Sequence, residues 1–200
     1  MQRTPRPPKE EVRARVVRAA GAVFAERGFA AASMDQVAAA AGFTKGAVYS
    51  SFASKDELFL ALVQEVTGER VAAVEAVLRT TSDLAEALAG VGAQLSRRDP
   101  TWQLLFLEFW QRALRDPAVR AAFVASRRDL RTRIAEVVAR FLADHPARAG
   151  WNAETLTVVL LALVNGLALE SLPDPEAVPD GVLARVLADL LAGPDRESSR

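Results

Sequence analysis

The chain of 200 residues contains no cysteine and a single histidine, His145. Without cysteine it can form neither a disulfide nor a thiolate metal site, which suits a reducing compartment, and we expect a cytoplasmic protein. One histidine argues against a His-based metal site and against a catalytic triad. The chain also lacks a phosphate loop, a G-x-S-x-G motif and, near its start, the apolar stretch of a signal peptide. We therefore expect no enzyme activity, no metal and no cofactor.

Lysine is scarce as well, and two of the three lysines stand in one short segment, "GFTKGAVYSSFASKDEL". Lys45 and Lys55 each follow a residue type that caps helix N-termini, Thr44 and Ser54. A cation at a helix N-terminus faces the positive end of the helix dipole, which is mildly unfavourable. A phosphate bound there would make the lysine favourable, because free N–H groups and the ammonium would then share one anion. The alternative is that both lysines are solvated surface residues, and the residues alone leave the two interpretations open.

The net charge is zero, but the basic residues gather toward the front of the chain. Up to Asp56 there are nine Lys/Arg against five Asp/Glu, a balance of +4, and the remainder carries −4. A basic front half favours a polyanion partner for that half, although a solvated basic face would look the same. Residues 1–9, with three prolines, indicate a mobile basic arm.

The hydrophobic pattern predicts an all-α protein with a helix-turn-helix near its start. Apolar residues with a helical period follow Glu10, and Gly28 is suited to end that helix. Ser33 and Gln36 match a capping box for a short second helix that Gly42 stops. A third helix is expected from Lys45 to near Phe52, and Ser54 caps a longer one. Two short helices joined by "AGFT" within 33–52 match a helix-turn-helix, although a short helical hairpin can also be plain core structure.

The rest of the chain also predicts helices only. Asp99-Pro100 and Asp116-Pro117 each place a capping acid before a proline at the first helical position. The apolar run between Glu154 and Glu170 is short for a membrane span and contains Asn165, so we expect other helices to bury it on all sides. A helix of this kind near the end of a chain often needs a second subunit to cover it. Adjacent Asp56 and Glu57 are interpreted as solvated acids of a first helical turn rather than as catalytic carboxylates.

Residues 15–63 resemble the N-terminal DNA-binding domain of the TetR family of transcriptional regulators. The shared pattern consists of Ala19, Ala20, Phe24, Gly28, Phe29, Ser33, Val37, Ala38, Ala41, Gly42, Gly46, Val48, Tyr49, Phe52, Lys55 and Leu58. The resemblance implies a DNA-binding domain at 10–70 and a helical ligand-binding and dimerisation domain at 71–200. It also implies a homodimer formed through the last two helices, about 152–192, and a third helix that reads the major groove of a palindromic operator.

Carried over residue by residue, the resemblance assigns the DNA contacts. It implies phosphate contacts by Thr44, Lys45, Tyr49 and Lys55, bases nearest to Gly46, Ala47 and Ser50, and a further backbone contact by Ser33 at the start of the preceding helix. Many members have an aromatic residue or histidine where this chain has Ser50 and Ser51. Because serine makes few base contacts, direct readout is expected to be thin.

These observations favour a homodimeric repressor that a small ligand releases from its operator. If the second domain has a pocket, its candidate lining is Trp102, Phe106, Phe109, Trp110 and Phe123, which would suit an apolar or aromatic ligand. The same spacing is that of a core stripe, which is the better explanation for most of these rings. The alternative function is a helical protein-interaction module without DNA binding; no membrane partner is expected.

Overall fold

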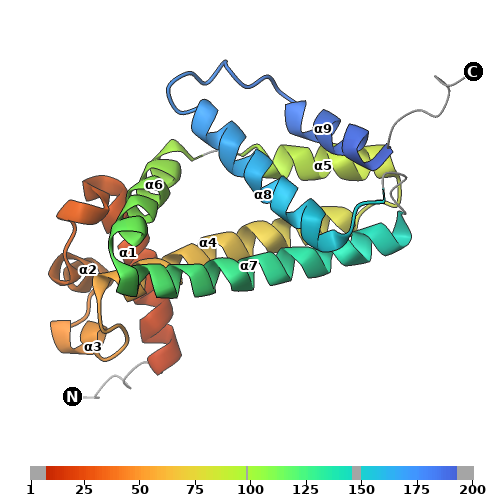
Figure 1. Cartoon of the computed structure of the whole chain (residues 1–200). Coiled ribbons are helices and arrows are strands. Elements are labelled where there is room, and N and C mark those ends of the chain that lie inside the picture. The colour runs from red at the N-terminus through yellow and green to blue at the C-terminus, as the bar shows by residue number, and fades with distance from the viewer. Residues whose placement is uncertain (1–7, 98, 146–149, 193–200) are drawn as a thin grey trace, which may run out of the picture. The chain divides into compact units, whose positions relative to one another are not determined.

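The computed structural model describes residues 8–97, 99–145 and 150–192, and within these ranges the chain forms nine helices and no strand (Figure 1). The all-α prediction is therefore confirmed. Most of the arm expected at residues 1–9 lies outside the described residues. The helices are α1 (Lys9–Ala31), α2 (Met34–Ala41), α3 (Lys45–Tyr49), α4 (Lys55–Leu78), α5 (Leu84–Leu95), α6 (Pro100–Arg115), α7 (Pro117–Asp144), α8 (Ala153–Glu170) and α9 (Val182–Ala192).

The capping residues begin the helices where the sequence predicts. Ser33 Oγ accepts from Gln36 N–H while the Gln36 side chain accepts from Ser33 N–H, so the capping box is confirmed. Asp99 accepts from the N–H groups of residues 101 and 102, and Asp116 from those of 118 and 119. Each of these bonds satisfies a helix N–H that has no partner within the helix.

Two helices differ from the sequence expectation at their ends. α3 ends at Tyr49 rather than near Phe52. The hydroxyl of Ser50 donates to Ala47 O at 2.7 Å, a local side-chain bond that competes with helix propagation. At Gly28 the backbone turns to φ 76 and ψ 162, so this glycine ends the long part of α1 as expected, although one more helical turn follows it.

The described chain forms two compact units. The first contains the residues up to 66 together with 104–126, although the sequence assigned the latter to the second domain. Its core is a group of phenylalanine rings: Phe59 stacks on Phe109 with centroids 4.5 Å apart, and Phe29 meets both rings edge-on at 5.1 and 5.3 Å. Residues of α4 and of the 104–126 segment thus pack with the end of α1.

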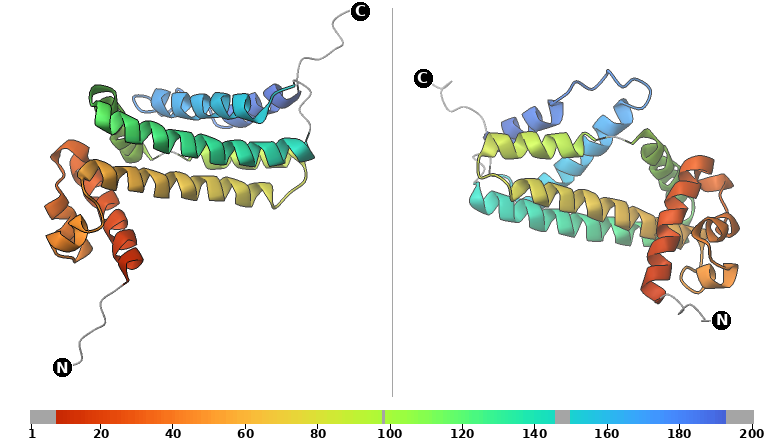
Figure 2. Two further views of the ribbon diagram at one scale, coloured as in Figure 1. Left: turned by 60° about the horizontal axis from the view of Figure 1, so that its bottom comes forward. Right: turned by 180° about the vertical axis from the view of Figure 1, so that it is seen from behind.

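The second unit contains 67–103 and the residues from 127 onward. Its core is aliphatic and joins α5, α7, α8 and α9, where α5 lies directly against α9 (Figure 2). Gly92 makes this approach possible, since a Cβ at this position would stand 2.7 Å from Ala184 Cβ. The core is made of Leu88, Val91, Val138, Leu156, Leu183, Leu187 and Leu191.

The apolar helix α8 is the main departure from the expected burial. It is long and apolar enough to cross a membrane by length and composition, and only 17% of it is buried. Val158 and Leu169 are 56% and 50% exposed. The described helices of this one chain therefore do not bury it on all sides: those of its unit cover one side, and the opposite side is uncovered. Full burial, as the sequence predicts, would require a second subunit.

Candidate nucleic-acid interface

The turn between α2 and α3 depends on Gly42. This residue has φ 72 and ψ 29, the left-handed conformation that a side chain disfavours. Its N–H donates to Ala39 O, and the N–H of Phe43 donates to Ala38 O at 3.0 Å, which satisfies the last carbonyls of α2. Thr44 then caps α3 by accepting from Ala47 N–H at 3.3 Å. The two helices are therefore joined as the helix-turn-helix prediction requires.

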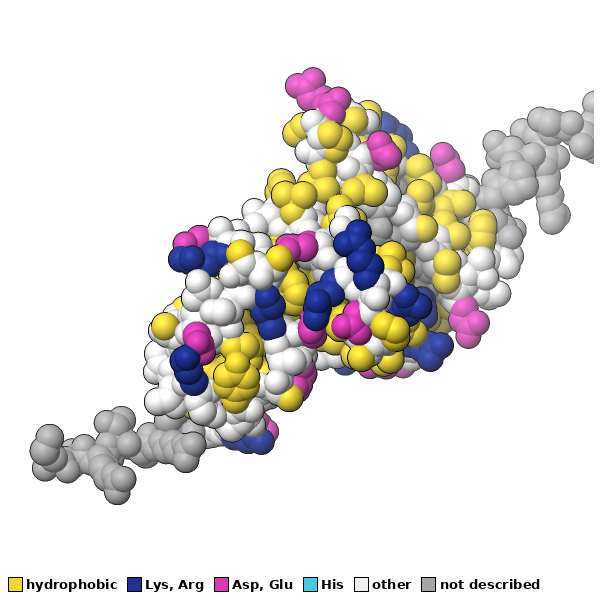
Figure 3. All heavy atoms as spheres, turned by 60° about the vertical axis from the view of Figure 1, so that its left-hand side comes forward, with side chains coloured by type: hydrophobic (Ala, Val, Ile, Leu, Met, Phe, Trp, Pro, Cys, Tyr) yellow, Lys and Arg dark blue, Asp and Glu magenta, His cyan; other side chains and the backbone are white. Residues whose placement is uncertain are grey.

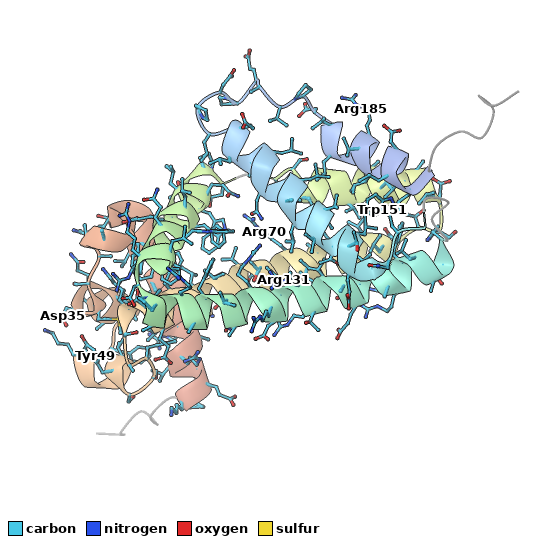
Figure 4. The ribbon with its side chains drawn as sticks, viewed as in Figure 1. Asp35, Tyr49, Arg70, Arg131, Trp151 and Arg185 are labelled. Carbon is cyan, nitrogen blue, oxygen red and sulfur yellow. The ribbon has the colours of Figure 1, made fainter. Side chains whose placement is uncertain are left out.

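α3 presents most of its predicted DNA contacts to solvent. Val48 is fully buried and anchors the helix, while Tyr49 is 52% exposed. A Cβ added at Gly46 would meet nothing within 4 Å, so this part of the helix leaves open space for a partner. Figure 4 shows Tyr49 on α3 and Asp35 on α2 in the same unit. The exposed predicted residues are Ser33, Thr44, Lys45, Gly46, Tyr49 and Ser50, and Ala47 is half-buried.

Lys45 has an acidic neighbour that offsets its position at a helix N-terminus. Its ammonium donates to the carboxylate of Asp35, which lies in the first turn of α2. The lysine side chain is 67% exposed and that of Asp35 50% exposed, so the pair is weak and leaves the ammonium accessible. The face drawn in Figure 3 likewise shows basic side chains among acidic ones, not one continuous basic field.

Lys55 is placed differently, at the end of α1. Its ammonium donates to the carbonyls of Phe29, Ala30 and Ala32 at 2.7, 3.0 and 2.8 Å. An ammonium has three donors, so all of them are used within the protein. Burial lowers the pKa of Lys55, and Arg112 acts in the same direction, while Asp56 and Glu108 raise it. The phosphate contact expected of Lys55 stays a prediction, and the structure gives this lysine an internal role.

The same backbone segment is held from its other side by Glu108 of α6. Its two carboxylate oxygens accept from the N–H groups of Phe29 and Ala30 at 2.9 and 2.8 Å. One turn further along α6, Arg112 forms a two-fold ion pair with Asp56 at 2.6 and 2.9 Å, and this contact raises the pKa of Arg112. Asp56 is thus a partner of Arg112 and not the solvated acid that the sequence suggested. No local pattern marks a pair 56 residues apart.

The candidate pocket rings pack mostly against one another. Trp110 and Phe123 meet with centroids 5.4 Å apart, and Phe106 lies 5.4 Å from Trp110 and 6.0 Å from Phe123. Phe109 is fully buried in the phenylalanine core. Trp102 is also buried but belongs to the second unit. The structure therefore brings four of the five rings together in contacts that are typical of a packed core.

The second unit also holds two half-buried guanidinium groups that the sequence gave no reason to single out. Burial lowers the pKa of Arg70 on α4, while the negative charge of Asp99 acts in the opposite direction (Figure 4). Burial also lowers the pKa of Arg127 on α7, and the like charge of Arg131 lowers it further. The Asp99 carboxylate thus partly compensates the half-buried charge of Arg70.

Comparison with protein families matches both parts of the chain. Residues 16–62 match the bacterial regulatory proteins of the tetR family. Residues 83–193, more than half of the chain, match the C-terminal part of BetI-type transcriptional repressors. The two matched regions together include all nine helices of the described chain except parts of α1 and α4.

Individual relatives include both activators and repressors. The transcriptional activator FasR of Mycolicibacterium smegmatis is 43% identical over 76 residues, 38% of this chain and 35% of FasR. The transcriptional repressor AcnR of Corynebacterium glutamicum is 29% identical over 112 residues, 56% of each chain. The chain thus spans about a third and about half of the length of these curated relatives. A transcriptional regulator from Rhodococcus sp. Rha1 has a similar structure, with a TM-score of 0.66, 30% identity, and coverage of 88% of this chain and 91% of that one.

Proposed function

Because the chain belongs to the TetR family of bacterial regulatory proteins and is a DNA-binding transcriptional regulator, we propose that it acts as a homodimeric repressor that a small ligand releases from a palindromic operator. The observation that carries the DNA-binding part is the exposed surface of α3 after the Gly42 turn. The match to BetI-type repressors over residues 83–193 supports repression rather than activation.

The proposed DNA surface consists of α3 and the start of α2. Lys45, Thr44 and Tyr49 supply an ammonium and two hydroxyl groups for phosphate oxygens. Gly46, Ala47 and Ser50 lie nearest to the base edges, and Ser33 approaches the backbone from the start of α2. Lys55 stands apart from this set, because its ammonium is already shared among three carbonyls.

The proposed dimer forms through α8 and α9. The uncovered side of α8 includes Val158, which is 56% exposed, and Leu169, which is 50% exposed. A second copy of the chain would cover this apolar side and, by two-fold symmetry, present two copies of α3 to two operator half-sites. If each subunit makes three or four phosphate contacts, affinity should fall roughly a thousandfold or more between about 50 and 200 mM salt.

The proposed ligand binds the second domain and has an apolar or aromatic body. Of the five candidate rings, Trp102 lies in the second unit and is the one proposed to contact the ligand, while Phe109 packs in the phenylalanine core of the first unit. Such a ligand would release DNA if it bound better to a conformation in which the two copies of α3 are wrongly spaced.

The test is a footprint of the purified protein on the DNA upstream of its own gene at two salt concentrations. We expect a protected, roughly palindromic stretch that fades at the higher salt. Absence of protection there, followed by absence of enrichment in a genome-wide fragment selection, would overturn the proposal. If the fragment selection shows no enrichment and the folded protein binds another protein instead, the alternative of a protein-interaction module is favoured.

A further inference from the structure

Three cations of the first unit share one arrangement. Each donates to a carbonyl at the C-terminal end of a different helix and lies over a phenylalanine ring next to that end. Arg13 donates to Ser51 O at 3.0 Å, just after α3, and its guanidinium carbon is 4.2 Å from the centre of the Phe52 ring. The last carbonyls of a helix have no partner within the helix, so a cation there is doubly favourable.

Arg15 and Lys55 repeat the arrangement at the other two helices. Arg15 donates to Ala41 O, the last residue of α2, at 3.2 Å and lies 4.6 Å from the centre of the Phe43 ring. A Cβ at Gly42 would stand 3.7 Å from Arg15 Nη2, so the guanidinium fills the space beside the turn. Lys55 donates to three carbonyls at the end of α1, and its Nζ is 4.6 Å from the centre of the Phe29 ring.

We propose that Arg13, Arg15 and Lys55 are positioning residues for operator recognition. They fasten the ends of α3, α2 and α1, respectively. They act on DNA binding through the orientation of α3 rather than through contact with phosphate. The geometry supports this because the two arginines start from one helix, α1, and reach the ends of both helices of the helix-turn-helix. The angle of α2 and α3 to α1 is thereby fixed by two charged contacts. This inference rests on the proposed function, because it concerns how the operator is bound.

The proposal changes how the basic front half is interpreted. Of the nine basic residues up to Asp56, these three are engaged with helix carbonyls. Lys45 keeps its ammonium exposed and is the cation of α3 that remains for phosphate. A count of positive charges therefore overstates the number of phosphate contacts that this half of the chain makes.

The experiment measures the affinity of the full-length variants R13M and R15M for the protected operator and for a scrambled duplex of equal length. Methionine keeps an unbranched apolar stem but removes the guanidinium and its donors. The matched control is R18M, since Arg18 is an exposed arginine of the same helix without a hydrogen bond, ion pair or ring contact to other residues of the described ranges. Affinity is determined at several salt concentrations, under conditions where circular dichroism shows every variant fully folded.

We expect R13M and R15M each to lose about five- to tenfold in operator affinity. Affinity for the scrambled duplex and the slope of log affinity against log salt should stay as in the unsubstituted protein. R18M should change both duplexes alike, and R15K, which still donates to the carbonyl and lies over the ring, should recover most of the loss. K55M should lose more than R13M, because Lys55 makes three hydrogen bonds.

Two results for R15M would overturn the proposal. If R15M weakens both duplexes equally and lowers the salt slope by about one per subunit, Arg15 binds phosphate. If a folded R15M keeps the ratio of operator to scrambled affinity, Arg15 has a structural role only. If the unsubstituted protein itself does not distinguish the duplexes, the proposed function fails. In that case, amide hydrogen exchange of residues 42–52 tests whether Arg13 and Arg15 fasten the helix ends. Exchange should be faster in R13M and R15M than in R18M, and equal exchange rates would overturn this part of the proposal.

Discussion

The ammonium of Lys55 and the carboxylate of Glu108 bind the same backbone segment from its two chemically opposite sides. The lysine donates to the C=O groups of Phe29 and Ala30, and the glutamate accepts from the N–H groups of the same two residues. The turn that follows Gly28 is thus satisfied on both sides by charged side chains, which form stronger hydrogen bonds than neutral ones.

Removing the Glu108 carboxylate should destabilise the first unit. We expect E108A to lower the free energy of unfolding by about 1–3 kcal/mol, because two backbone N–H groups lose a charged acceptor. E108Q, which retains one carbonyl oxygen, should lose less. Urea unfolding followed by circular dichroism measures both. The control is E136A, a change at an exposed glutamate of α7, and an E108A variant as stable as E136A would contradict the prediction.

Lys45 and Asp35 should affect DNA binding in opposite directions. K45A should weaken binding to every duplex and lower the salt slope by about one per subunit, because the exposed ammonium is proposed to bind phosphate. D35N should strengthen binding, since it removes a negative charge beside the same phosphate. Because the pair is exposed, both variants should keep the stability of the unsubstituted protein within about 0.5 kcal/mol. Titration of a labelled duplex at several salt concentrations measures the slope, and an unchanged slope in K45A would remove Lys45 from the DNA surface.

Acidic substitutions on the uncovered side of α8 should give monomers. V158E and L169E each place a charge where a second copy of the chain is proposed to pack, and burial of an unpaired charge is costly. Sedimentation velocity should show a monomer for these variants and a dimer for the unsubstituted protein. V124E is the control, since Val124 is also an exposed valine but lies on α7 in the first unit. A V158E protein that remains fully dimeric would place the interface elsewhere.

Alanine at Gly92 should destabilise the second unit although alanine favours helices. The new Cβ would stand 2.7 Å from Ala184 Cβ and 3.1 Å from the Ala184 backbone, so α9 would have to move away from α5. We expect a loss of about 1–3 kcal/mol in thermal or urea unfolding. G68A is the matched control: a Cβ at Gly68 meets nothing within 4 Å, and the change should stabilise α4 by up to about 1 kcal/mol. Equal effects of the two substitutions would contradict the prediction.

The sequence predicted what short-range chemistry decides. Ser33 with Gln36, and the Asp-Pro pairs at 99 and 116, begin helices because a side-chain oxygen reaches an N–H group two or three residues away. Gly42 ends α2 for an equally local reason, the left-handed backbone. These signals place the helix-turn-helix and the all-α architecture without knowledge of the tertiary fold.

The roles of individual charges were beyond the sequence. Lys45 and Lys55 follow similar capping residues, yet one is exposed beside Asp35 and the other is bound to carbonyls more than 20 residues away. Asp56 meets Arg112 only because the start of α4 and residues 104–126 belong to one unit. The sequence predicted that helices cover α8, but an apolar composition does not tell whether the covering side chains come from the same chain or from a second one.

The phenylalanine core limits how far the DNA-binding part can be treated as a separable module. Phe109 stacks on Phe59, and Glu108 caps the turn after Gly28, so residues 104–126 complete the unit that the first 66 residues begin. A fragment cut near residue 70 would expose Phe29 and Phe59 and leave the turn without its carboxylate. A chimeric regulator joined at that point would therefore combine two core halves that come from different proteins and do not fit. A chimera that also transfers α6 and the start of α7 should fold.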